Sequence, residues 1–329
     1  MGRVSGDRQV INLRHMKKED LREVNLLLSK AFTQARIHQG YREGRVPLCR
    51  KEFLELYFAA NSSGCFVIEK NHRLISFCFT RLWGTVSWLG PLSVDPSEEG
   101  QGYGKKIVLA AVESLKTSGA KTIGLELAAN SARNLAFYTK LGFEPRGLVI
   151  DVIKKVSGER QPLKLTEFNK IMYSEISPQK RTPLLEDARK FWRQIEPGLD
   201  YTRELELVEN FEFGDACFIM KSDRIIGFIL AHTQTYSQEE KRRFIKINAL
   251  QMSSEMTKET LDVFIEVIEN WAFSEKLSAI YLRVSSQQNN VFSHLLSRQF
   301  KVLHNDLRMT LSGYGQETDL TSINFSKWE

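Results

Sequence analysis

Residues 92–106 read LSVDPSEEGQGYGKK and join an apolar run to a helical pattern. The apolar run ends at Asp95-Pro96, and glycines follow at positions 100, 102 and 104. Glycine lets backbone N–H groups turn inward, because no Cβ stands in the way. The N-terminus of the helix behind the loop adds positive potential. The stretch therefore predicts a strand, a loop and a helix that together hold an anion, most often a phosphate group.

Two common phosphate motifs do not fit this loop. A Walker A loop counted from Gly100 requires glycine at position 105, and the dinucleotide fingerprint requires glycine at the same position. Lys105 stands there. The loop must therefore belong to another class of phosphate site.

A second motif follows at residues 130–143, which read NSARNLAFYTKLGF. Here a helical pattern carries Tyr138 four residues before Gly142-Phe143, and Gly142 stands where a helix C-terminal cap is expected. The two motifs, in this order and with a helix and a strand between them, resemble the GCN5-related N-acetyltransferase (GNAT) family. The matched positions are Leu92, Val94, Pro96, Glu99, Gly102, Gly104, Tyr138, Gly142 and Phe143.

The resemblance implies acetyl-CoA as co-substrate. It implies that the backbone at Leu92 and Val94 pairs with the pantetheine arm while their side chains join the core. Lys105 would bind the 3′-phosphate or cover the surface, and Asn134 would contact the CoA arm or stay an exposed helix residue. The cofactor-binding residues so implied are Leu92, Val94, Glu99, Gly100, Gln101, Gly102, Tyr103, Gly104, Lys105 and Asn134.

One position departs from the family pattern. Glu99 stands where the family has arginine or glutamine. A carboxylate aimed at a pyrophosphate would repel it. We therefore expect Glu99 either to point to solvent or to lower the affinity for the cofactor.

Tyr138 is the catalytic residue that the resemblance implies. A phenol held beside the leaving CoA thiolate can donate the proton that the thiolate needs. The alternative is a helical tyrosine packed in the core with a solvated hydroxyl. Glu126 is a candidate general base on the strand after the long helix, but a structural glutamate is the more ordinary interpretation. A free amine or a water relay would need no dedicated base.

The composition is typical of a globular protein in the cytoplasm. No run is apolar enough to cross a membrane, and the start of the chain has no hydrophobic signal core. The four cysteines form no C-x-x-C pair, and the six histidines lack companions at metal-ligand spacing, so we expect reduced thiols and no metal. We interpret Cys65 and Cys78 as core residues.

The net charge of +6 is unevenly distributed. Residues 1–157 carry 24 Lys and Arg against 15 Asp and Glu, a net of +9, and the remainder carries −3. The positive residues are dispersed, and CoA is itself a polyanion, so we do not expect a nucleic-acid partner.

The first half has the α/β pattern of a mixed, mostly antiparallel sheet flanked by helices. Apolar periodicity predicts strands and helices in alternation. The predicted strands are 10–14, 65–69, 74–82, 85–94 and 122–127, with a last strand pair ending near 156; the predicted helices are 18–32, 52–60, 104–118 and one ending at 141. We expect a catalytic domain at 1–157 and a linker at 157–162.

The second half repeats the first faintly. Residues 217–228 parallel 65–77, and residues 279–284 parallel 122–127, which predicts a tandem GNAT fold. The repeat lacks the chemistry, because no glycine lies between Gly227 and Gly313 and Leu295 stands in place of Tyr138. We expect a degenerate domain at 158–329 that shapes the substrate groove or forms a homodimer surface.

We interpret the chain as an N-acetyltransferase that transfers acetyl directly to a primary amine of a small molecule or protein. The loop at 33–48, rich in arginine, is a candidate lid for an acidic acceptor or a solvated loop. The alternative function is a non-catalytic acyl-CoA sensor or binding module that keeps the fold. Glu99 and the missing base favour this alternative, whereas Tyr138 and the glycines favour the enzyme.

Overall fold

A computed structural model describes residues 10–315 and 322–326 except 43, 157–166 and 255–256. The chain divides into two compact units, one formed by residues up to Arg81 and Leu89–Ser118, the other by Leu82–Trp88 and residues from Gly119 onward. This division differs from the expected domains at 1–157 and 158–329. The expected linker at 157–162 lies outside the described residues, and that domain boundary stays a prediction.

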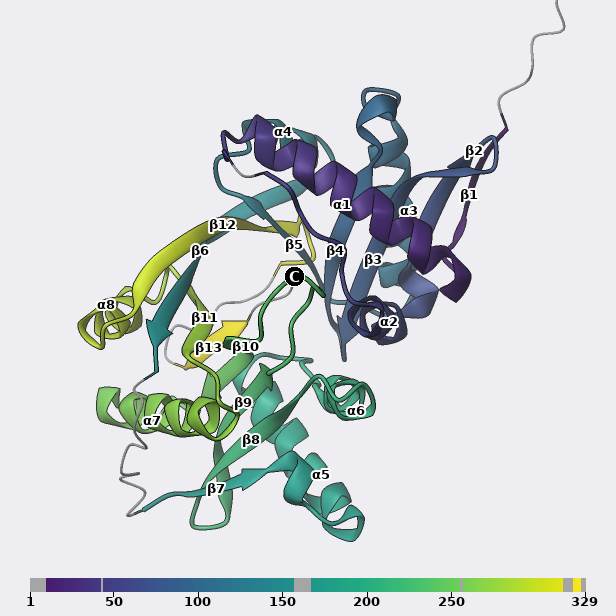
Figure 1. The fold of residues 1–329 in the computed structure, drawn as a ribbon. Helices are drawn as coiled ribbons and strands as arrows, with labels where there is room; N and C mark the ends of the chain where they lie inside the picture. The colour runs from purple at the N-terminus through teal and green to yellow at the C-terminus, as the bar shows by residue number, and fades with distance from the viewer. Residues whose placement is uncertain (1–9, 43, 157–166, 255–256, 316–321, 327–329) are drawn as a thin grey trace, which may run out of the picture. The chain divides into compact units, whose positions relative to one another are not determined.

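The first unit is an antiparallel sheet with helices packed against it (Figure 1). Its elements are β1 (Ile11–His15), α1 (Leu21–His38), α2 (Lys51–Ala60), β2 (Phe66–Lys70), β3 (Arg73–Trp83), the end of β4 (Val86–Val94) and α3 (Tyr103–Thr117). The predicted apolar face of α1 is buried at Leu21, Val24, Leu27, Leu28 and Ala31. The helix continues six residues beyond its predicted end at Phe32, so the expected loop at 33–48 begins as helix.

The second unit holds the rest of the chain. Its elements are β5 (Thr122–Ala128), α4 (Ala132–Lys140), β6 (Phe143–Lys155), β7 (Asn169–Met172), α5 (Pro178–Ile195), α6 (Thr202–Asn210), β8 (Gly214–Lys221), β9 (Arg224–His232), β10 (Phe244–Met252), α7 (Lys258–Ser274), β11 (Ala279–Ser285), α8 (Asn289–Ser297), β12 (Lys301–Leu311) and β13 (Ile323–Ser326). The start of β4 also belongs here, where Val86–Trp88 pair in parallel with β5.

Helices cover both faces of the sheet in the second unit. Cys217 and Ile219 of β8 pack into one apolar cluster with α7, while Ala216 and Phe218 pack into another with α5 and α6. Successive side chains of a strand point to opposite faces, so this alternation buries the sheet on both sides. The architecture is the expected mixed, mostly antiparallel sheet flanked by helices.

Details of strand pairing confirm the duplication. The β2–β3 hairpin turns at Asn71-His72 and the β8–β9 hairpin at Ser222-Asp223, and all four residues have positive φ. Each hairpin has a register shift two to three residues before its turn. The pairing of β4 with β5 covers three residue pairs, as does the pairing of β10 with β11.

The last strands of the two halves are exchanged. β12 lies between β5 and β6, and β6 lies between β12 and β11 (Figure 1). The expected strand pair at the end of the first half is therefore wrong: a single strand runs over Phe143–Lys155, and its partners come from the second half. The strand passes through Pro145-Arg146-Gly147 because a register shift against β12 absorbs one residue there.

Candidate functional site

The entry to the glycine loop is anchored by Asp95, directly after β4. Its carboxylate accepts hydrogen bonds from the Ser97 backbone N–H and hydroxyl at 2.9 and 2.8 Å, and from the Lys30 ammonium of α1 at 2.8 and 2.9 Å. Burial alone would raise the pKa of Asp95, but the Lys30 and Ser97 donors prevail and lower it to about 2. Asp95 is therefore an anionic clamp between α1 and the loop.

A second ion pair holds the loop from the other side. Glu98 accepts a hydrogen bond from the Lys70 ammonium at 2.8 Å, at the turn between β2 and β3. Arg73 lies 3.8 Å from the same carboxylate. Neither anchor was anticipated from the sequence, although the lysines and carboxylates were visible in it, because only the fold brings positions 30, 70, 95 and 98 together.

After these anchors the backbone makes a turn at two glycines. Gly100 and Gly102 have φ of +77° and +84°, a region that favours glycine. A Cβ built at either position meets nothing within 4 Å. Gly102 is also the N-cap of α3 and supplies no side-chain cap. The first N–H groups of a helix have no intrahelical acceptor, so this turn suits a bound anion such as a CoA phosphate.

The other predicted loop residues divide by exposure. Glu99, Gln101 and Lys105 are exposed, and Gly104 lies in the first turn of α3. Tyr103 is 8% exposed, so only its backbone is placed to meet a ligand. The exposure of Glu99 agrees with the expectation that it points to solvent.

The strand before the loop leaves one backbone edge free of strand pairing. β4 registers with β5 only from Val86 to Trp88, and no other described strand takes that edge of β4 further along. Leu92 and Val94 lie in that later part. We expected their side chains in the core, but they are half-buried. The reason is that only the first four residues of β4 are fully buried.

Tyr138 sits in α4 of the second unit and is 8% exposed. Its ring meets Phe137 and Phe143 edge to face, with centroids 4.9 and 5.8 Å apart. Asn134, one turn earlier, is half-buried. The loop belongs to the first compact unit and Tyr138 to the second, so their joint action is part of the proposal below.

Glu126, the candidate base, is held by two guanidinium groups. On β5 it accepts hydrogen bonds from Arg308 Nε and Nη2 at 3.0 and 2.6 Å and from Arg283 Nη1, and its side chain is 5% exposed. The two guanidinium groups occupy the lone pairs of the carboxylate. This geometry supports the structural interpretation of Glu126 over the catalytic one.

The cysteines are free, and three of them are buried. Cys65 and Cys78 are fully buried, and burial raises the pKa of the Cys65 thiol to about 12. A neutral buried thiol is a weak nucleophile, which supports the core interpretation of both residues. Over the described residues, no group of three His, Cys, Asp or Glu side chains is arranged to hold a metal ion.

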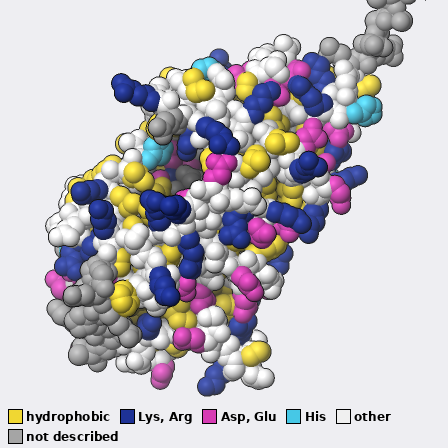
Figure 2. All heavy atoms as spheres, in the orientation of Figure 1, with side chains coloured by type: hydrophobic (Ala, Val, Ile, Leu, Met, Phe, Trp, Pro, Cys, Tyr) yellow, Lys and Arg dark blue, Asp and Glu magenta, His cyan; other side chains and the backbone are white. Residues whose placement is uncertain are grey.

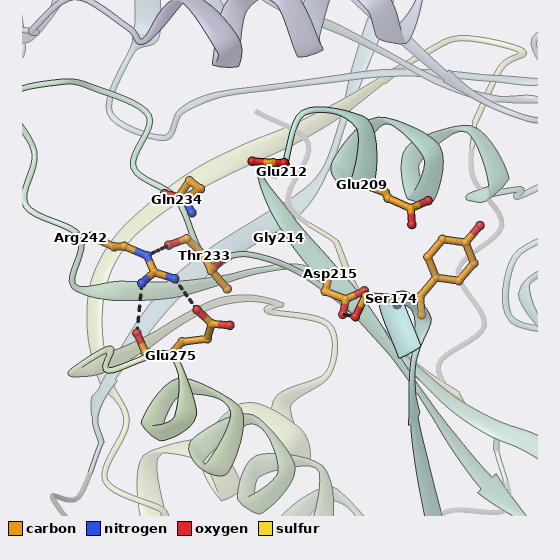
Figure 3. Close-up of a pocket in the computed structure, with 10 residues that line it drawn as sticks. Ser174, Glu209, Glu212, Gly214, Asp215, Thr233, Gln234, Arg242 and Glu275 are labelled. Atoms are coloured by element: carbon orange, nitrogen blue, oxygen red, sulfur yellow. Dashed lines mark hydrogen bonds and ion pairs between the residues drawn. The ribbon is translucent and has the colours of Figure 1, made fainter. Parts of the chain in front are cut away.

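A pocket of about 280 Å³ opens in the second half, away in sequence from every predicted site residue (Figure 3). Asp215 there accepts hydrogen bonds from the Ser174 backbone and hydroxyl, and burial raises the pKa of Asp215. Arg242 donates to the Thr233 carbonyl at 2.8 Å and to the Glu275 carboxylate at 2.5 Å. Arg242 and Glu275 pair with each other, Asp215 is held by Ser174, and we assign the pocket no ligand.

The surface charge and the hydropathy of the helices can be described for the residues that the structure covers. On the face shown in Figure 2, Lys and Arg are spread among Asp and Glu. None of the described helices combines the length and apolar character that crossing a bilayer requires.

Sequence comparison relates part of the chain to a known family. Residues 27–143 match the family described as the acetyltransferase (GNAT) family. This stretch is similar to a GNAT domain. Over 78 residues, 24% of its length, the chain is 30% identical to the alanine N-acetyltransferase of ribosomal protein bS18 from Escherichia coli K12. The chain spans about half the length, 53%, of that curated relative.

Structure comparison extends the GNAT fold to the whole chain. A putative acetyltransferase from Pyrococcus horikoshii matches with a TM-score of 0.66 and 16% identity, covering 100% of this chain and 98% of that one. A tandem GNAT protein of the clavulanic acid biosynthesis pathway matches with a TM-score of 0.58 and 9% identity, covering 94% and 100%. The chain thus has the tandem GNAT form, with a second half that lacks the loop glycines.

Proposed function

We propose that this tandem GNAT protein transfers an acetyl group from acetyl-CoA to a primary amine of a small molecule or a protein. The carrying observation is the uncapped N-terminus of α3 behind Gly100 and Gly102, with open space where their Cβ atoms would stand. The backbone edge of β4 at Leu92–Val94 would pair with the pantetheine arm. Lys105 would meet the 3′-phosphate from its exposed position, and Asn134 the CoA arm.

In this proposal the amine attacks the thioester carbonyl directly. A tetrahedral intermediate forms, the C–S bond breaks, and the CoA thiolate leaves while acetyl remains on nitrogen. Tyr138 donates a proton to that thiolate, and solvent accepts the proton that the amine loses. Glu126 takes no part, because its carboxylate is committed to two arginines.

According to its name, the curated relative reported above acetylates an alanine of a ribosomal protein. A protein N-terminus is therefore one candidate acceptor. We keep small amines as the other. The predicted cytoplasmic location, the homodimer surface and the lack of a nucleic-acid partner stay predictions.

A second candidate function is a non-catalytic acyl-CoA sensor. It is favoured by the engagement of Glu126 and by the unusual carboxylate at Glu99. Release of free thiol from acetyl-CoA, measured over amino acids, polyamines and peptides, separates the two. Amine-dependent thiol release supports the enzyme, whereas acetyl-CoA binding without thiol release for any acceptor supports the sensor.

A further inference from the structure

The last described strand, β13, occupies an edge of β10 that β11 leaves open. β11 pairs with β10 only at Phe244–Lys246. From Ala249 to Met252 the partner is β13, in antiparallel register. β9 pairs along β10 as far as Met252, so it takes the opposite edge. β13 also contacts β11, and therefore lies where β10 and β11 separate.

The same edge of the first half has no strand on it. β4 and β10 each have nine residues, and each pairs with the following parallel strand over its first three. Leu92 and Val94 of β4 thus correspond to Leu250 and Met252 of β10. Among the strands that the structure describes, none pairs with Leu92–Val94 on that edge, whereas Leu250 and Met252 pair with Phe325 and Ile323.

Beyond the main-chain pairing with β10, β13 makes specific side-chain contacts. Phe325 is 2% exposed and belongs to the apolar cluster under α7. Asn324 donates to the Glu196 carboxylate at 3.0 Å and accepts from the Gln251 amide at 3.2 Å. The Ser326 carbonyl accepts from Arg308 Nη2 at 3.0 Å. Phe325 therefore lies in an apolar cluster, Asn324 hydrogen-bonds two side chains, and the Arg308 guanidinium donates to the backbone of β13.

We propose that the edge of β10 beyond its pairing with β11 is a peptide-strand site, occupied by the chain's own residues 322–326. In this half the peptide lies along the edge that, under the proposed function, holds the pantetheine arm in the other half. Main-chain pairing supplies affinity and the pockets for alternate side chains supply specificity, as in β-strand addition to a sheet. With β13 on this edge, a cofactor arm is excluded from the second half. The loop after β10 in this half also has no glycine.

The test uses a chain that ends at Thr321 and a fluorescent peptide TSINFSKWE, residues 321–329. Fluorescence anisotropy should show one peptide site per truncated chain and no binding to the intact chain. A Phe325→Asp peptide should bind at least about tenfold more weakly, because it loses a fully buried aromatic side chain. A peptide of the same composition in scrambled order is the matched control. A folded truncated chain that ignores the peptide, or binds the scrambled one equally, overturns the proposal.

A measurement on the intact chain keeps the proposal testable if the truncated chain does not fold. Amide hydrogen exchange should show protection at Ile323–Ser326, and a full-length Phe325→Ala variant should lose it there and at Ala249–Met252. Exchange of the β13 amides at free-peptide rates would overturn the site. Neither readout uses acetyl-CoA, so it is independent of the proposed activity.

Discussion

Arg283 of β11 and Asp151 of β6 form a two-pronged ion pair inside the sheet. The Nε–Oδ1 distance is 2.6 Å and the Nη2–Oδ2 distance 2.7 Å, and both side chains are 1% exposed. The same guanidinium donates to Asp306 at 2.7 Å and to Glu126. One arginine therefore joins carboxylates on three strands, two of them from the first half and one from the second.

Replacing Arg283 should strongly destabilise the protein. Arg283→Met leaves three carboxylates without their shared cation, and breaking such a buried network costs about 3–5 kcal/mol. Urea unfolding of the variant and the wild type measures the difference. Arg203→Met, which removes a half-exposed i,i+3 pair with Glu206, is the control and should cost about 1 kcal/mol or less. Equal losses in the two variants would show that the network contributes no more than a surface pair.

Acetyl-CoA should bind one site per chain, and Gly102→Asp should remove it. The substitution fills the open space of the turn and adds a negative charge beside the phosphates. Gly119→Asp is a closely matched control, because Gly119 has the same φ of +84° and the same open surroundings at the other end of α3. Isothermal titration calorimetry measures both. Two equal sites in the wild type, or normal binding by Gly102→Asp, would contradict the assignment.

Glu99→Gln should tighten acetyl-CoA binding or leave it unchanged. The exposed carboxylate is a like charge near the pyrophosphate, and solvent screens it in part. Glu98→Gln is the comparison, because it breaks the ion pair with Lys70 and should weaken binding by loosening the loop. A clear loss of affinity in Glu99→Gln would assign Glu99 a bracing role.

Tyr138→Phe should lower kcat by about 10²–10⁴-fold and leave acetyl-CoA affinity nearly intact, because the proton is needed only as the thiolate leaves. The loss should shrink with an acyl donor whose thiol is more acidic. Tyr201→Phe, at a fully buried tyrosine of the second half, controls for removal of a phenol. Unchanged turnover in Tyr138→Phe, with chemistry rate-limiting, would return Tyr138 to the core.

The Asp95 clamp predicts a pH dependence of stability. Its pKa in the folded state is lowered to about 2, so its contribution is present above the unfolded pKa of about 3.9 and is lost as the pH falls toward 2. Lys30→Met should destabilise at pH 6 by about 1 kcal/mol or less, since Lys30 is half-exposed. The difference from wild type should vanish between pH 4 and 2 in urea unfolding. A difference that stays constant over that range would assign the loss to packing of the Lys30 stem.

Local patterns of the sequence were sufficient for most elements of the first half and for the glycine turn. The apolar spacing of α1, the turn at Asn71-His72 and the glycines at 100 and 102 are each set by neighbours a few residues apart. Helical period, turn chemistry and backbone freedom act over that range, so they can be predicted from the chain alone. Even so, the pattern gave the end of α1 six residues too early.

Apolar periodicity predicted most strands and helices of the first half, and faint internal similarity predicted that the second half repeats the first, whereas the anion site at the glycine loop stays a proposal. Only the tertiary structure decided the exchange of β6 and β12, the seating of β13 beside β10, and the capture of Glu126 by Arg283 and Arg308. The physical reason is that strand alternation specifies which face a residue occupies but not which strand lies beside it. Glu126 and Arg283 stand 157 residues apart, and their contact exists only because β5, β12, β6 and β11 are neighbours in one sheet.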